Sequence, residues 1–130
     1  MSMVTGKVNF SLDEETNLVV LSFNAPGKDA EEHDAMAMET KAWAESLLKR
    51  FPDRKFKVLV DLTNAGLPTT SASKIYIETL SDNHITKTAF FGVSSSIQSI
   101  ITFIVNSAGR GEHSKFFIDK ANALAWLNEE

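Results

Sequence analysis

Hydrophobic residues alternate with polar ones in the first part of the chain, which is the period of a half-buried β-strand. The alternating apolar positions are Val8, Phe10 and Leu12. The polar segment 13–17 then leads into the apolar run 18–23, so the sequence predicts two strands that are paired in a hairpin.

A long helix is predicted after the break that Pro26 and Gly27 make in this pattern. Asp29 is placed to cap its first turn, and the helix ends before Pro52, because proline cannot continue a helix. Large apolar residues recur along the segment at helical spacing, at positions Met36, Trp43, Leu47 and Phe51.

The rest of the chain repeats a strand followed by a helix. Apolar runs at 57–62, 88–93 and 115–118 are typical of strands that are covered on both faces. Hydroxyl residues or a carboxylate open the helix that follows each strand and are suited to cap it. The last helix is expected to bury Ala121, Leu124, Ala125 and Trp126 or Leu127.

The order of these elements is β-β-α-β-α-β-α-β-α, which predicts an α/β fold. A strand–helix alternation after an opening hairpin gives a mainly parallel, mixed sheet of five strands that is flanked by helices. Neither a linker nor an internal repeat interrupts the pattern, so residues 1–130 are predicted to form a single domain.

Composition and charge narrow the class of protein. The 130 residues are 43% hydrophobic and 23% charged, as in an ordinary globular domain. The net charge of −4 and the lack of clustered Lys and Arg argue against nucleic acid or an anionic membrane as a partner. The absence of cysteine excludes disulfides and thiolate chemistry. No segment has the pattern of a signal peptide or membrane span, so we expect a cytoplasmic protein that is not transmembrane.

Three stretches resemble the SpoIIAA-like (STAS/SEC14-like) family of small bacterial proteins: KVLVDLTNAG, TAFFGVSSSIQSIITFIVNSAG and KFFIDKANALAWLNEE. The likeness covers roughly three-quarters of the chain, and its most recognisable piece is the closing pattern strand-Asp-x-x-x-Ala-x-x-Trp-Leu. The resemblance implies frequent dimerisation and no established enzymatic chemistry. We therefore expect a non-enzymatic regulatory or protein-interaction module that acts as a homodimer or on another protein, without a cofactor.

The resemblance also implies a position for regulation. Anti-sigma-factor antagonists related to this family are phosphorylated on a Ser or Thr after a strand's terminal Asp, in a pattern close to Asp-Ser-Ser-Gly. In this chain a longer turn follows Asp61, and the hydroxyl run begins only at Thr69. Ser71 and Ser73 are candidate phosphorylation sites, which mass spectrometry of native protein would detect. The alternative is that Thr69 or Ser71 only caps the helix.

A second candidate site lies where the strands end, because parallel sheets bind ligands beyond the carboxyl ends of their strands. The polar residues expected at this edge are Asp61, Thr63, Asn64, Ser94, Ser95, Ser96 and Asp119. They serve equally well as helix caps and turn formers. The sequence contains no nucleophile motif, and its three histidines lack metal-ligand spacing, so neither a catalytic residue nor a metal site is predicted.

The third predicted helix carries more apolar residues than one face of a surface helix needs. Its middle is almost without a polar side, owing to Ile100, Ile101, Phe103, Ile104 and Val105. We expect a homodimer partner to cover it. The alternative, suggested by the SEC14 side of the resemblance, is a small apolar, lipid-like ligand beneath the helix. Its lining would include Phe90, Phe91, Phe116 and Phe117.

Overall fold

The computed structural model describes residues 5–129, and its elements follow the predicted order. These elements are β1 (Val8–Asp13), β2 (Leu18–Phe23), α1 (Ala30–Arg50), β3 (Phe56–Asp61), α2 (Thr70–Leu80), β4 (Ile85–Phe91), α3 (Ser95–Ser107), the short 3-10 helix η1 (Gly111–His113), β5 (Ser114–Phe117) and α4 (Lys120–Leu127).

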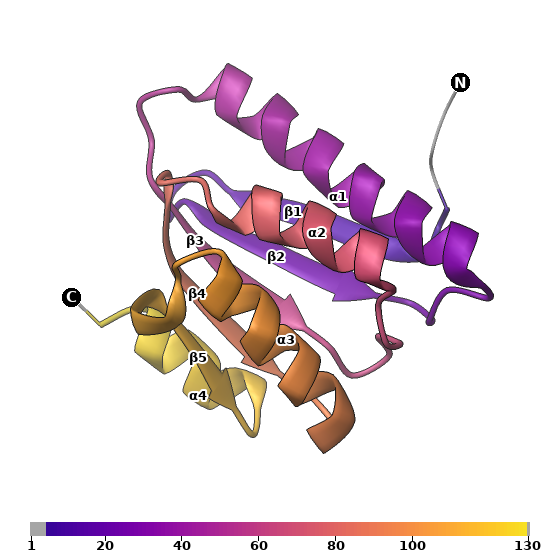
Figure 1. The fold of residues 1–130 in the computed structure, drawn as a ribbon. Coiled ribbons are helices and arrows are strands. Elements are labelled where there is room, and N and C mark those ends of the chain that lie inside the picture. The colour runs from indigo at the N-terminus through magenta and orange to yellow at the C-terminus, as the bar shows by residue number, and fades with distance from the viewer. Residues whose placement is uncertain (1–4, 130) are drawn as a thin grey trace.

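The five strands form one mixed sheet in the order β1-β2-β3-β4-β5. β1 and β2 are antiparallel, and the other three neighbouring pairs are parallel. Helices α1, α2 and α3 cover one face of the sheet, whereas α4 lies on the other face (Figure 1). The predicted mixed α/β architecture is therefore confirmed.

Each of the four α-helices begins at a residue whose side chain accepts a hydrogen bond from an amide three positions later. Asp29 accepts from the amide of Glu32, and Thr69 accepts from the amide of Ala72. The remaining two caps are Ser94 and Asp119. These bonds satisfy amides that have no partner within the first helical turn, so the short polar residues before each apolar segment fix where the helices begin.

The extent of β4 and the buried face of α4 differ from the predictions. β4 begins at Ile85 rather than at Thr88, and it ends at Phe91 rather than at Val93, because Gly92 has a φ of 74° and leaves the extended conformation. In α4, the predicted positions Ala121 and Ala125 are exposed, whereas Ala123 is fully buried. The face of α4 that packs on the sheet therefore contains Ala123 and Leu127, and it differs from the face that the apolar spacing predicted.

The core consists of separate clusters on the two faces of the sheet. On the face with three helices, one cluster lies beneath α1 and another beneath α2 and α3. On the opposite face, Leu59 and Ala89 of the sheet pack against Ala123 and Leu127 of α4. Within residues 5–129, no helix combines the length and apolar character needed to cross a membrane.

Candidate functional site

A cavity of about 150 Å³ lies between the sheet and the three helices α1, α2 and α3. The strands contribute apolar side chains such as Val19, Val58 and Phe90 to its lining. The helices contribute Met36, Thr40, Trp43, Ala44, Leu47, Tyr76, Leu80, Ile101 and Ile104. Protein interiors are close-packed with few voids larger than a water molecule, so a cavity of this size is the most distinctive feature of the core.

The cavity lies between the two clusters on this face of the sheet. Leu47 and Phe56 belong to the cluster beneath α1, while Val60 and Ile104 belong to the cluster beneath α2 and α3. Val58 of β3 packs against both clusters and lines the cavity. Val58 therefore lies where the two clusters meet, at the cavity between them.

Most polar groups at the cavity are already satisfied or uncharged. Thr40 Oγ1 donates to the carbonyl oxygen of Met36 at 2.9 Å, and Thr79 Oγ1 donates to that of Ile75 at the same distance. Burial raises the pKa of Tyr76 to about 12, so its phenol is neutral at physiological pH. Such a lining favours an uncharged apolar molecule, which gains by leaving water.

One end of the cavity lies at His33, where the loops before α1 and α2 approach each other. A Cβ atom on Gly66 would lie 2.6 Å from Cβ of Pro26 and 3.1 Å from Cε1 of His33. A Cβ atom on Gly27 would lie 2.7 Å from Cδ2 of His33. The absence of a side chain at both glycines therefore lets the two loops pack closely against the imidazole of His33, which lines the cavity.

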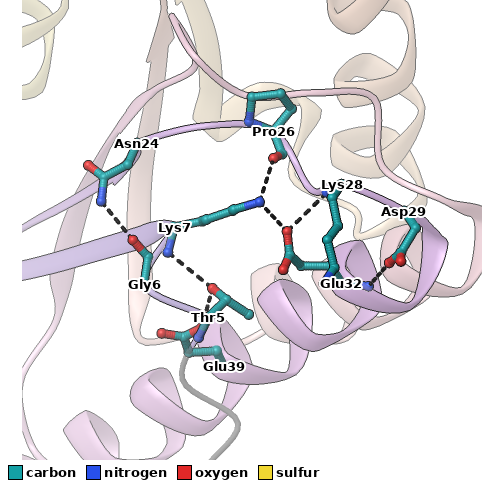
Figure 2. A network of polar contacts seen from close by, with 9 residues as sticks. All are labelled: Thr5, Gly6, Lys7, Asn24, Pro26, Lys28, Asp29, Glu32 and Glu39. Carbon is teal, nitrogen blue, oxygen red and sulfur yellow. Dashed lines mark hydrogen bonds and ion pairs between the residues drawn. The ribbon is translucent and has the colours of Figure 1, made fainter.

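A polar network fixes the start of α1 beside this end (Figure 2). The Lys7 ammonium group pairs with the Glu32 carboxylate and donates to the carbonyl oxygen of Pro26 at 3.3 Å. The backbone amide of Lys28 donates to the same carboxylate at 3.0 Å. The hydrogen bond from Lys7 is the main cause that lowers the pKa of Glu32, so the carboxylate is held in its charged form.

The residues predicted as phosphorylation sites lie at the start of α2, against α1. Asp34 accepts hydrogen bonds from Thr69 Oγ1 at 2.6 Å and from Ser71 Oγ at 2.7 Å. These bonds, with that from Thr69 the larger cause, lower the pKa of Asp34. Ser73 is 7% exposed, whereas Ser71 is exposed. Phosphorylation stays a prediction, and a phosphate on Ser71 would face the Asp34 carboxylate and repel it.

None of the residues predicted at the carboxyl edge of the sheet lines the cavity. Asp61 accepts hydrogen bonds from the amide and hydroxyl of Thr63, at 2.9 and 2.6 Å. Ser94 and Asp119 cap helices, and Asn64, Ser95 and Ser96 are exposed. The structure therefore gives Asp61, Thr63, Ser94 and Asp119 turn and cap contacts, and a ligand at this edge stays a prediction.

The apolar residues of α3 separate into inward-facing and outward-facing positions. Ile101, Ile104 and Val105 are buried against the sheet, and Ile100 is half-buried. Phe103 is the large apolar residue of this helix that reaches solvent, with 60% of its surface exposed. Gln98, Ser99, Thr102 and Asn106 complete an exposed polar side. Most of the wide apolar stripe is thus covered within the molecule.

The four phenylalanines proposed as ligand lining face two different sides of the sheet. Phe90 lines the cavity and stacks on Phe116, with ring centroids 5.3 Å apart. Phe91 and Phe117 instead pack on the opposite side, where Phe117 contacts Trp126 of α4. α1 contributes more residues to the cavity lining than any other element, and its apolar residues looked like ordinary core positions in the sequence.

Metal binding has no candidate within the described range 5–129. No group of three or more His, Asp or Glu side chains there is arranged to hold a metal ion. The carboxylate of Asp82 is instead hydrogen-bonded by the ring and amide nitrogens of His84, at 2.6 and 2.8 Å.

Comparisons with known proteins identify the fold. No protein-family model matches the sequence, and no curated protein matches it. Among solved structures, the chain is similar to an uncharacterised DUF3478-family protein from Shewanella loihica PV-4 that has a SpoIIAA-like fold. The two share 19% sequence identity with a TM-score of 0.62, over 92% of this chain and 91% of the other. This chain therefore has the SpoIIAA-like fold that its sequence pattern indicated.

Proposed function

We propose that this protein binds a small, uncharged apolar molecule in its cavity and does not transform it, so that it acts as a carrier or sensor. The observation that carries the proposal is the unfilled space of about 150 Å³ among apolar side chains. A cavity of roughly this size lined by Leu, Ile and Phe can stay dry and bind benzene. Burial of the ligand's apolar surface supplies the free energy of binding.

The size of the cavity narrows the earlier expectation of a lipid-like ligand. Pockets for drug-sized ligands have volumes of roughly 300–1,000 Å³. The cavity here, about 150 Å³, is smaller and suits a molecule with the size of a single aromatic ring. It also extends beneath α1 and α2 rather than beneath α3 alone. A small volatile or aromatic compound is therefore a better candidate than a complete lipid.

Toluene is a suitable probe, and replacing Val58 by phenylalanine is expected to abolish its binding by filling the space between the two clusters. For the unmodified protein, toluene at ten times its dissociation constant should stabilise the fold by about 1.4 kcal/mol. Thermal unfolding with and without toluene measures this effect. Val20→Phe is the matched control, because Val20 packs on the opposite face of the sheet.

The two variants separate cavity binding from binding elsewhere. The proposal requires that Val20→Phe keeps the toluene-induced stabilisation and that Val58→Phe loses it. An equal response of both variants to toluene would show that the molecule binds outside the cavity.

A second candidate function is contact with another copy of this chain through α3, which the exposure of Phe103 favours. A SpoIIAA-like fold supports a STAS-type module in general, and large exposed apolar side chains are common at partner surfaces. In this proposal, Phe103→Glu places a charge in the interface and converts a dimer to a monomer.

Light scattering of the purified variants tests the dimer. Met38→Glu is the control, because Met38 is 48% exposed on α1 and lies outside the proposed interface. If α3 forms the dimer interface, the molar mass of Phe103→Glu should be half that of the unmodified protein, and the molar mass of Met38→Glu should be unchanged. An unchanged mass for Phe103→Glu would contradict it.

A further inference from the structure

Thr88 is the most deeply buried polar residue at the cavity, with 2% of its surface exposed. It belongs to β4, between Val58 of β3 and Ser114 of β5 in the parallel register. Neighbouring residues of parallel strands point to the same face of the sheet. Thr88 therefore lies on the floor of the cavity, beneath the helices.

The Thr88 hydroxyl has no hydrogen-bond partner among residues 5–129 of the structure. Thr40 and Thr79, which also line the cavity, donate to carbonyl groups of their own helices. Thr88 lies in a strand, where the carbonyl group four residues earlier is too far away to accept such a hydrogen bond. The Oγ atom of Ser114, the neighbour of Thr88 on β5, is buried and also lacks a hydrogen-bond partner. The polar groups of buried residues are normally hydrogen-bonded, so an unpaired hydroxyl of a buried residue at a cavity points to a missing polar group.

We infer that the ligand carries one uncharged oxygen, as in a phenol, an alcohol or a ketone, and that Thr88 forms a hydrogen bond with it. This inference rests on the proposed binding function and specifies the chemistry of the ligand. A threonine hydroxyl both donates and accepts, so it pairs with a carbonyl as well as with a hydroxyl group. The remaining, apolar part of the ligand contacts the surrounding side chains.

The lining also explains why the oxygen is uncharged. None of the described lining residues is Lys or Arg, and the imidazole of His33 is packed against Gly27 and Gly66, so a carboxylate or phosphate beside Thr88 would lack a neighbouring Lys or Arg. Burying an unpaired charge costs far more free energy than burying a hydrogen-bonded hydroxyl. The charged side chain of Asp82 at the lining is already engaged by His84 and would repel an anion.

Phenol and toluene form a matched pair of probes, because they differ by a hydroxyl in place of a methyl group. Calorimetry of both probes with the unmodified protein and with Thr88→Val tests the inference. Valine keeps the shape of threonine without its hydroxyl. We expect Thr88→Val to weaken phenol binding by about fivefold, the loss of one hydrogen bond, and to leave toluene binding within about twofold.

Two further variants complete the experiment. Thr102→Val removes an exposed hydroxyl on α3 and is expected to change the affinity of neither probe. Thr88→Ser keeps the hydroxyl and is expected to keep phenol binding, which covers the case in which Thr88→Val does not fold. A loss of phenol binding in Thr88→Ser as large as in Thr88→Val would overturn the role of the hydroxyl.

The outcomes separate this inference from the proposed function. If both probes bind and Thr88→Val leaves the ratio of their affinities unchanged, Thr88 does not recognise an oxygen, while binding in the cavity stands. If neither probe binds the unmodified protein, the proposed function itself is wrong, and the inference fails with it.

Discussion

Replacement of Gly92 by alanine is expected to lower the free energy of unfolding by about 3 kcal/mol. Gly92 ends β4 with a φ of 74°, which side-chain-bearing residues adopt only with strain. A Cβ atom there would lie 2.3 Å from Oγ1 of Thr63 and 3.0 Å from its backbone nitrogen. Because one of these atoms is backbone, the clash cannot be relieved by a side-chain rotation. Urea denaturation measures the loss.

Gly109→Ala is the control for this prediction. Gly109 has a φ of 73° after α3, but a Cβ atom there would meet nothing within 4 Å. Gly109→Ala should therefore lower the free energy of unfolding by about 1 kcal/mol, from backbone strain alone. Equal losses for the two variants would contradict the close approach of the turn after β4 to the turn after β3. This approach places Gly92 against Thr63, one of the residues expected at the carboxyl edge of the sheet.

Replacement of Leu127 by alanine is expected to cost about 3 kcal/mol of stability. Leu127 is 1% exposed and packs with Ala123 of α4 against Leu59 and Ala89 of the sheet. An isolated helix as short as α4 is not stable in water, so α4 depends on this contact. Thermal or chemical unfolding measures the change.

Leu124→Ala serves as the comparison, because Leu124 lies on the same helix but is only partly buried. Leu124→Ala should lower the free energy of unfolding by about 1 kcal/mol, because Leu124 buries a smaller apolar area than Leu127. A loss for Leu127→Ala no greater than that for Leu124→Ala would show that α4 does not pack on the sheet as the structure has it.

The element order and the helix starts could be predicted because they depend on local interactions. Asp29, Thr69, Ser94 and Asp119 each bond an amide three residues later, so sequence neighbours alone fix these positions. The alternation of strands and helices then restricts the topology to few arrangements. The mixed sheet and the SpoIIAA-like fold follow from these local signals.

The cavity could not be predicted, because it depends on how far the helices stand from the sheet. Met36 and Tyr76 show only helical spacing in the sequence, which is the same for a filled and an unfilled core. Thr88 began a predicted strand, and nothing nearby in sequence indicated that its hydroxyl would lack a partner. On α3, Ile104 and Val105 suggested an external partner because their contacts with distant strands could not be foreseen.

The position of bound toluene would show directly whether the cavity binds a small apolar molecule. A crystal structure of the protein soaked with toluene would show whether the ring enters the space between the sheet and helices α1, α2 and α3. We expect density for toluene in the cavity, in contact with Val58 and beside Thr88. An empty or collapsed cavity, with toluene bound only at the surface around Phe103, would contradict it.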